Sequence, residues 1–215
     1  MRTESDFLGS VKLPDDCLYG INTARAVSNF SISGKAVHKE LIYELIMLKR
    51  SAAVANRDAG LLDDNIAQYI VSACDKLSFK IDMSLFPTDT LQGGAGTSIN
   101  MNVNEVVCNT ALLIAGRRCG DYDFIDPLDH VNLNQSTNDI FPTAVRIASI
   151  KLIRKLSDGC AQLQTALQAK EQEFAHIKKI GRTELMNATE ITLGEQFGSY
   201  AQCIARDRWR IYKAE

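Results

Sequence analysis

One stretch of the chain limits its possible folds more than any other. From Pro142 to about Ile177, only Gly159 would weaken a helix. Apolar residues recur in this stretch at intervals close to three and a half, at Val145, Leu152, Leu156, Cys160, Leu163 and Leu167. A helix of about 35 residues would be about 50 Å long, roughly three times the average. Because a small compact domain cannot cover so long an apolar stripe, the pattern predicts one rod of a helical bundle.

Shorter helical patterns precede this stretch, and another follows it. The predicted helices span 40–59, begin at Asp63 or Asp64, span 98–118, and resume from 189 to 215 after a helix-to-helix turn at 180–183. We therefore predict an all-α fold. A mostly helical N-terminal domain over 1–138 is followed over 139–215 by the first long helices of a central helical bundle. Since the last helix reaches Glu215 without a cap, we expect a truncated N-terminal part of a larger protein.

Composition and charge argue against several classes of protein. The 215 residues carry 24 basic and 26 acidic side chains, and the net charge of −2 gives no basic surface for nucleic acid or anionic membranes. The longest apolar runs fall far short of the about 18 residues of a membrane span, and the polar start MRTESD lacks a signal-peptide core. The six cysteines form no CxxC pair and the three histidines no HExxH pattern. We expect buried free thiols, no metal site and a cytoplasmic protein.

Three polar segments interrupt the helical pattern, and the first is rich in glycine. Gly93–Glu105 places Thr97 and Ser98 just before a predicted helix, where free backbone N–H groups attract anions. A glycine turn with a serine cap is the structural alternative. The asparagines at 100, 102 and 104 are poor helix formers, so three of them within one and a half turns indicate polar contacts.

The other two segments carry hydroxyl, amide and arginine donors. Asp129–Thr143 comes directly before the long helix. It is either a capped loop, with Asn138 or Asp139 as the N-cap, or a set of donors for a carboxylate. Gly181–Phe197 offers Arg182 at the predicted turn, either for an anion or for capping backbone carbonyls.

Together and in this order, the segments resemble the signature regions of the fumarase/aspartase superfamily. The resemblance covers essentially the whole chain, and the form of the motifs is closer to the aspartate ammonia-lyase branch than to fumarases. The matching stretches are Asp6–Gly9, Leu18–Ala26, Gly94–Val106 (GAGTSINMNVNEV), His130–Thr143 (HVNLNQSTNDIFPT), and Gly181–Thr183 with Thr192–Gly194.

This resemblance implies an L-aspartase-like fold and a homotetramer with shared active sites. It implies β-elimination of ammonia from L-aspartate to give fumarate, with no organic cofactor. The partner is then a small dicarboxylate or amino-acid substrate, with no nucleic acid and no membrane. Loss of the Cβ proton puts negative charge on the adjacent carboxylate, which hydroxyl and amide donors can stabilise. By resemblance, the substrate-binding residues are Thr97, Ser98, Ser136, Thr137, Asn138, Thr183 and Glu184.

Two departures from the family pattern keep other interpretations open. The loop with the signature GSSxMPxKxN, which carries the family's general-base serine, is absent, because the chain contains no Met-Pro pair. We therefore expect no catalytic base in this chain and no activity from it alone. Glu184 stands where relatives usually carry His or Gln, and it would repel a dicarboxylate unless protonated. It favours a substrate with a cationic group or marks a degenerate site. The alternatives are a fumarase or other superfamily lyase with a different leaving group, and a non-catalytic helical oligomerisation protein on a lyase scaffold.

Overall fold

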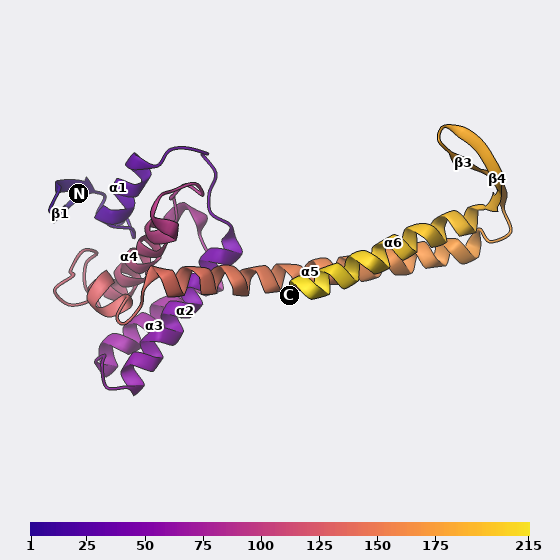
Figure 1. Cartoon of the computed structure of the whole chain (residues 1–215). Helices are drawn as coiled ribbons and strands as arrows, with labels where there is room; N and C mark the ends of the chain where they lie inside the picture. Colours follow the sequence, from indigo (N-terminus) through magenta and orange to yellow (C-terminus); the bar gives the residue numbers. More distant parts are fainter. The chain divides into compact units, whose positions relative to one another are not determined.

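The computed structural model describes all residues from Met1 to Glu215, and the chain divides into two compact units. The first unit comprises Met1–Ala148 and the second Ser149–Glu215, so helix α5 (Thr137–Glu173) begins in the first and continues in the second. Helices dominate each unit, and each unit also contains one two-stranded antiparallel hairpin (Figure 1). The predicted all-α class is confirmed. None of the helices combines the length and the low charge that crossing a membrane requires.

Helix α4 (Thr97–Ile114) is the centre of the first unit. It packs against three other α-helices, a short π-helical turn and a 3-10 turn, and Val103, Val106, Ala111 and Leu112 are fully buried. Around it lie β1 (Arg2–Asp6), β2 (Gly9–Leu13), α1 (Ile21–Asn29), α2 (Lys39–Asp58), α3 (Asp64–Phe79), η1 (Met83–Leu85), η2 (Gly94–Gly96) and η3 (Pro127–Val131). Burial on every side explains why α4 lacks the one-sided apolar pattern of α2 and α3.

Local capping fixes where several helices begin. The Asp63 carboxylate accepts hydrogen bonds from the backbone N–H groups of Asn65 and Ile66 at 2.8 and 3.3 Å, which starts α3 as predicted. A reciprocal capping box between Thr192 and Glu195 starts α6 (Leu193–Ala214). These caps satisfy N–H groups that have no partner inside the helix.

Two buried carboxylates hold the start of α1. Glu105 of α4 accepts from the backbone N–H groups of Gly20 and Asn22, both at 2.8 Å, and from the Thr23 hydroxyl at 2.5 Å. Glu4 of β1 accepts from the Ile21 N–H at 2.8 Å. Negative charge at a helix N-terminus is favourable, so these contacts fasten α1 to both α4 and the N-terminal hairpin.

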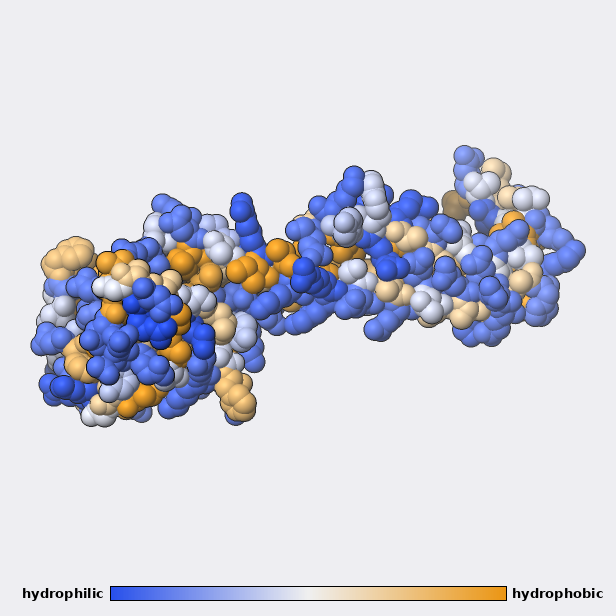
Figure 2. Space-filling view, turned by 90° about the horizontal axis from the view of Figure 1, so that it is seen from below, coloured by the Kyte–Doolittle hydropathy of each residue, from blue (hydrophilic) through white to orange (hydrophobic).

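The second unit is a pair of helices joined by a hairpin. The remainder of α5 is followed by β3 (Lys178–Thr183), β4 (Met186–Thr192) and α6. Gly194 and Gly198 let α6 approach α5 closely, because a Cβ atom on either would overlap Glu171. Apolar side chains remain at the surface of this unit among polar ones (Figure 2), including Leu156, Leu163, Trp209 and Tyr212.

Three sequence-based boundaries are wrong. Residues 180–192 form the β3–β4 hairpin instead of a helix-to-helix turn and the first turn of a helix. The sequence hid the hairpin because its two turn residues, Glu184 and Leu185, are neither Gly nor Asn. Helix α4 ends at Ile114, before Gly116 with its φ of +73°, and not at residue 118. The long helix spans 37 residues from Thr137, and Pro142 lies inside its second turn, where the missing N–H removes one intrahelical hydrogen bond without ending the helix.

The six cysteines are free thiols, as expected, but not all of them are buried. Cys74, Cys108 and Cys119 are buried, and Cys203 is exposed. Burial raises the pKa of the Cys74 thiol to about 12. Low thiolate content makes a buried cysteine an inert part of the core.

Candidate functional site

The first two polar segments meet in the first unit, where α4 and α5 begin. A Cβ atom on Gly96 would lie 2.5 Å from the ring of Phe141, so the loop before α4 packs directly on the first turns of α5. The Asn100 Nδ2 atom lies 3.4 Å from the Thr137 Oγ1 atom. These contacts bring together the two segments that carry the predicted site residues, Thr97 and Ser98 in one and Ser136–Asn138 in the other, although about 40 residues separate them in the chain.

The loop before α4 has an uncommon backbone. Gly94, Ala95 and Gly96 all have positive φ, at +76°, +50° and +94°. Alanine rarely adopts this conformation, so Ala95 is strained, and such strain is typical of functional loops. The Thr97 hydroxyl donates to the Gly94 carbonyl at 2.5 Å, and the side chain of Gln92 accepts from the Ile99 N–H at 3.0 Å. These bonds fix the hydroxyl-bearing turn at the start of α4.

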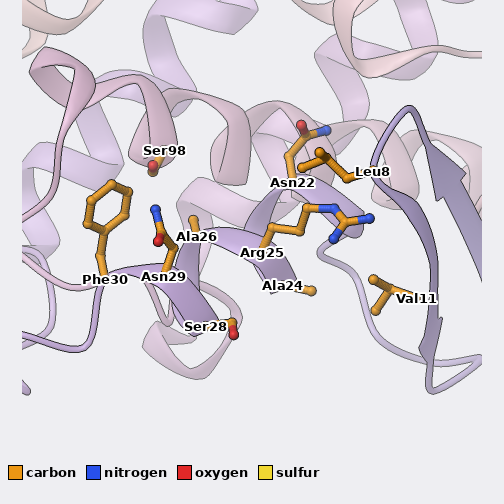
Figure 3. A pocket seen from close by; sticks show the side chains of 10 residues that line it. All are labelled: Leu8, Val11, Asn22, Ala24, Arg25, Ala26, Ser28, Asn29, Phe30 and Ser98. Carbon is orange, nitrogen blue, oxygen red and sulfur yellow. The ribbon is translucent and has the colours of Figure 1, made fainter.

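A cavity of about 700 Å³ lies beside Ser98, between this turn and α1. Figure 3 shows Ser98 near Asn29 and Phe30, with Asn22 and Arg25 further along the cavity wall. Asp6 neutralises Arg25 through two hydrogen bonds of 2.7 Å, and this ion pair lowers the pKa of Asp6. The cavity beside Ser98 mixes polar and apolar side chains, and Arg25 offers it no free cation.

Ser136 caps the long helix, which corrects the prediction that Asn138 or Asp139 does. Its Oγ atom accepts from the Asn138 backbone N–H at 3.1 Å, and its carbonyl accepts from the N–H groups of Asp139 and Ile140, both at 3.0 Å. Asn138 itself is exposed. The predicted site residues Ser136, Thr137 and Asn138 thus form the first turn of α5, as a donor-rich helix start.

A buried polar cluster lies beneath this turn, and the sequence analysis missed its key member. Lys49 of α2 is fully buried, and its Nζ atom donates to Asn132 Oδ1 at 2.8 Å and Gln135 Oε1 at 2.9 Å. Asn100 and Asn104 of α4 also donate to Asn132 Oδ1, both at 3.2 Å. One signal was available in the sequence: Lys49 lies on the same helical face as Leu45 and Ala53, where a charge is unexpected.

The third segment belongs to the second unit. Thr183 ends β3, and Glu184 and Leu185 form the two-residue turn with φ of +49° and +63°. Both turn residues are exposed, and Leu185 is fully so. A cavity of about 710 Å³ runs along the hairpin and the start of α6, but neither Thr183 nor Glu184 lines it. Its wall mixes both charges, because Lys179, Arg182 and Glu190 line it, and Glu190 also pairs with Lys178 at 2.9 Å.

Comparison with known proteins gives a consistent assignment. Residues 9–215 match a family model described as Lyase. The chain is 48% identical to the aspartate ammonia-lyase of Bacillus sp over 211 residues, which is 98% of this chain and 45% of that protein. It is 43% identical to the class II fumarate hydratase of Thermosynechococcus vestitus over 205 residues, covering 95% of this chain and 44% of that protein.

A solved structure is similar over almost the whole chain. The crystal structure described as fumarate lyase:delta crystallin from Brucella melitensis superposes with a TM-score of 0.95 at 44% identity, over 99% of this chain and 50% of that one. The chain thus spans about half the length of the curated relatives and of the solved structure that it matches.

Proposed function

Because the chain belongs to the fumarase/aspartase superfamily of lyases, we propose that it supplies substrate-binding segments to an enzyme that converts L-aspartate into fumarate and ammonia. The observation that carries this proposal is the meeting of the hydroxyl-bearing starts of α4 and α5, where Gly96 packs on Phe141 and the Asn100 Nδ2 atom lies 3.4 Å from the Thr137 Oγ1 atom. Helix N-termini and hydroxyl donors together favour a carboxylate. The aspartate ammonia-lyases among the relatives favour aspartate as the substrate.

The proposed reaction is a β-elimination. A general base removes a proton from Cβ, the Cα–Cβ double bond forms, and the C–N bond breaks so that its electron pair leaves with the nitrogen. Negative charge gathers transiently on the carboxylate next to Cβ. Ser98, Ser136, Thr137 and Asn138 are the proposed donors to the substrate carboxylates, where they stabilise that charge in the transition state. Thr97, whose hydroxyl donates to the Gly94 carbonyl, is proposed to hold the turn that carries Ser98. We propose that the general base comes from residues outside these 215, because the chain lacks the GSSxMPxKxN segment.

Thr183 and Glu184 of the β3–β4 hairpin are two further residues that we propose to bind substrate. A carboxylate at position 184 attracts the ammonium group of aspartate, whereas the hydroxyl of malate carries no charge to attract. Glu184 would thereby favour aspartate over malate. Glu184→Gln in the active protein should lower the ratio of kcat/KM for aspartate to that for malate by about tenfold. If the ratio of the two kcat/KM values does not change, Glu184 does not bind the substrate.

The experiment that tests the activity follows fumarate by ultraviolet absorbance. The 215-residue chain and the full product of its coding sequence are each given aspartate, malate and argininosuccinate. We expect turnover of aspartate by the full product and none by the chain alone. Turnover by the chain alone would refute the idea that the base lies outside it. The same preparations, run through size-exclusion chromatography with light scattering, test a tetramer with shared sites.

Matched substitutions on α5 connect the activity to the proposed site. Thr137→Val removes a proposed donor and should lower kcat/KM by about 100-fold. Thr165→Val removes a hydroxyl that donates to the Ala161 carbonyl at 3.0 Å within the same helix, and it should leave kcat/KM unchanged. Equal effects from both would contradict a special role for Thr137.

A second candidate is the hydration of fumarate. The 43% identity to a class II fumarate hydratase favours it. In the same substrate comparison, malate would then be consumed faster than aspartate. A full product that consumes none of the substrates would favour a non-catalytic oligomerisation protein.

A further inference from the structure

A fully buried lysine beneath the proposed site has only neutral acceptors. Lys49 is 0% exposed, and its two acceptors are the side-chain amide oxygens of Asn132 and Gln135. Burial lowers the pKa of Lys49 from 10.5 to about 7, and the Cys74 thiol on α3 is the titratable group that faces it. Burying an amine in this way is costly, so a lysine at such a position calls for a reason.

Asn132 connects this lysine to the start of α5. Its Oδ1 atom accepts from Lys49, Asn100 and Asn104, and its Nδ2 atom donates to the Gln135 carbonyl at 2.9 Å. The Asn100 amide that donates to Asn132 also lies 3.4 Å from Thr137 Oγ1. Lys49 is therefore joined to the Ser136–Asn138 turn by two routes, through the main chain at Gln135 and through the side chain of Asn100.

The two hydrogen bonds of Lys49 give this network a direction. Its Nζ atom has enough N–H groups to donate to both acceptors whether or not it is protonated, so the oxygen of the Asn132 amide faces Lys49. Around that oxygen, Asn100 and Asn104 must present their NH₂ groups, and their own Oδ1 atoms are left buried without a hydrogen-bond partner. Asn100 therefore donates toward Thr137, and the Thr137 hydroxyl is left to donate its own proton elsewhere.

We propose that Lys49 is a positioning residue: it fixes the orientations of Asn132 and Asn100 and so keeps the Thr137 hydroxyl as a donor toward the substrate carboxylate. The role of Thr137 toward a substrate rests on the proposed function. The orientation of the network does not, and it is measurable without substrate.

The first test measures how well Lys49 orders the Ser136–Asn138 turn. Lys49→Met removes the donors in a side chain of similar length, and Lys76→Met is the matched control, an exposed lysine on α3. Amide hydrogen exchange at residues 136–138 should become about tenfold faster in Lys49→Met and stay within about twofold in Lys76→Met. Unchanged exchange in a folded Lys49→Met protein would overturn the proposal.

The second test uses the active protein and a double-substitution cycle. Lys49→Met should lower kcat/KM by about tenfold. Combined with Thr137→Val it should add less than about twofold to the loss from Thr137→Val alone, because no hydroxyl is left to orient. Combined with Thr183→Val it should act additively. Additive losses with Thr137→Val would reveal a merely structural role and overturn the proposal.

Two possible results of these tests each need a further measurement. If Lys49→Met does not fold, Asn100→Ala breaks the link between Asn132 and Thr137 while Lys49 keeps both acceptors. It must then show the faster exchange and the same non-additive loss, and a folded Asn100→Ala protein without them would overturn the proposal. If the wild-type protein has no turnover, the proposed function fails, and the exchange measurement still decides whether Lys49 orders the turn.

Discussion

Gly96→Ala tests the contact that brings the two halves of the proposed site together. Gly96 has a φ of +94°, and a Cβ atom there would lie 2.5 Å from two atoms of the Phe141 ring and 2.6 Å from a third. Ordinary contacts between carbon atoms are about 3.5–4.0 Å, so the ring would have to move by about 1 Å. Phe141 packs against the buried core, which resists that movement.

The expected loss of stability has two parts. A positive φ costs an L-residue about 1–2 kcal/mol, and overpacking against a rigid ring adds about 1–3 kcal/mol. Gly96→Ala should therefore lower the free energy of unfolding by about 2–5 kcal/mol. That is a large share of the about 5–15 kcal/mol that typically stabilises a protein.

Gly116→Ala is the matched control. Gly116 has a φ of +73°, but a Cβ atom there would meet nothing within 4 Å. This substitution should show the backbone cost of about 1–2 kcal/mol without the steric part. The difference between the two variants isolates the contact with Phe141.

The assay is equilibrium unfolding in urea, monitored by far-ultraviolet circular dichroism. The dependence of the free energy of unfolding on urea concentration is compared between variants. In a Phe141→Ala background, the cost of Gly96→Ala should fall by about 1–3 kcal/mol, because the ring is gone. Equal costs for Gly96→Ala in both backgrounds, or a cost no greater than that of Gly116→Ala, would refute the packing of the loop on α5.

Three further predictions concern other parts of the chain. Since the pKa of Lys49 is about 7 in the folded protein and 10.5 ordinarily, the unfolded chain binds more protons between these values. The free energy of unfolding of the wild type minus that of Lys49→Met should therefore rise by about 1.4 kcal/mol per pH unit above pH 7. If this difference, measured by urea unfolding, stays constant from pH 7 to 10, the burial of the amine is contradicted. Glu105→Gln places an amide N–H group against the N–H donors at the start of α1, so it should lower the free energy of unfolding by about 3 kcal/mol in the same assay. An unchanged free energy of unfolding would show that the carboxylate is not needed there. Replacing Glu184 and Leu185 by Asn and Gly supplies residues that adopt the two positive φ angles of the turn more readily. This replacement should slow amide exchange across β3–β4 by about tenfold, and faster exchange would argue against the observed turn.

Local patterns in the sequence were enough to find most helices and the family. The apolar spacing of α2, α3 and α5 depends on residues three and four apart, and the Asp63 cap depends on residues two and three apart. Such features can be read along the chain because their physical causes are local. The β3–β4 hairpin escaped because its turn uses residues that avoid positive φ, so tertiary context overrode local preference.

The sequence alone determined the helical class, the lyase family and the candidate segments at 97–98, 136–138 and 183–184. It did not determine that Gly96 would pack on Phe141, or that Lys49 would lie under the second segment. Lys49 and Asn132 are 83 positions apart, and their contact follows from how α2, α4 and η3 pack around one core. Only the tertiary structure decides such pairs, because burial turns an ordinary lysine on a helix into a donor that must find acceptors.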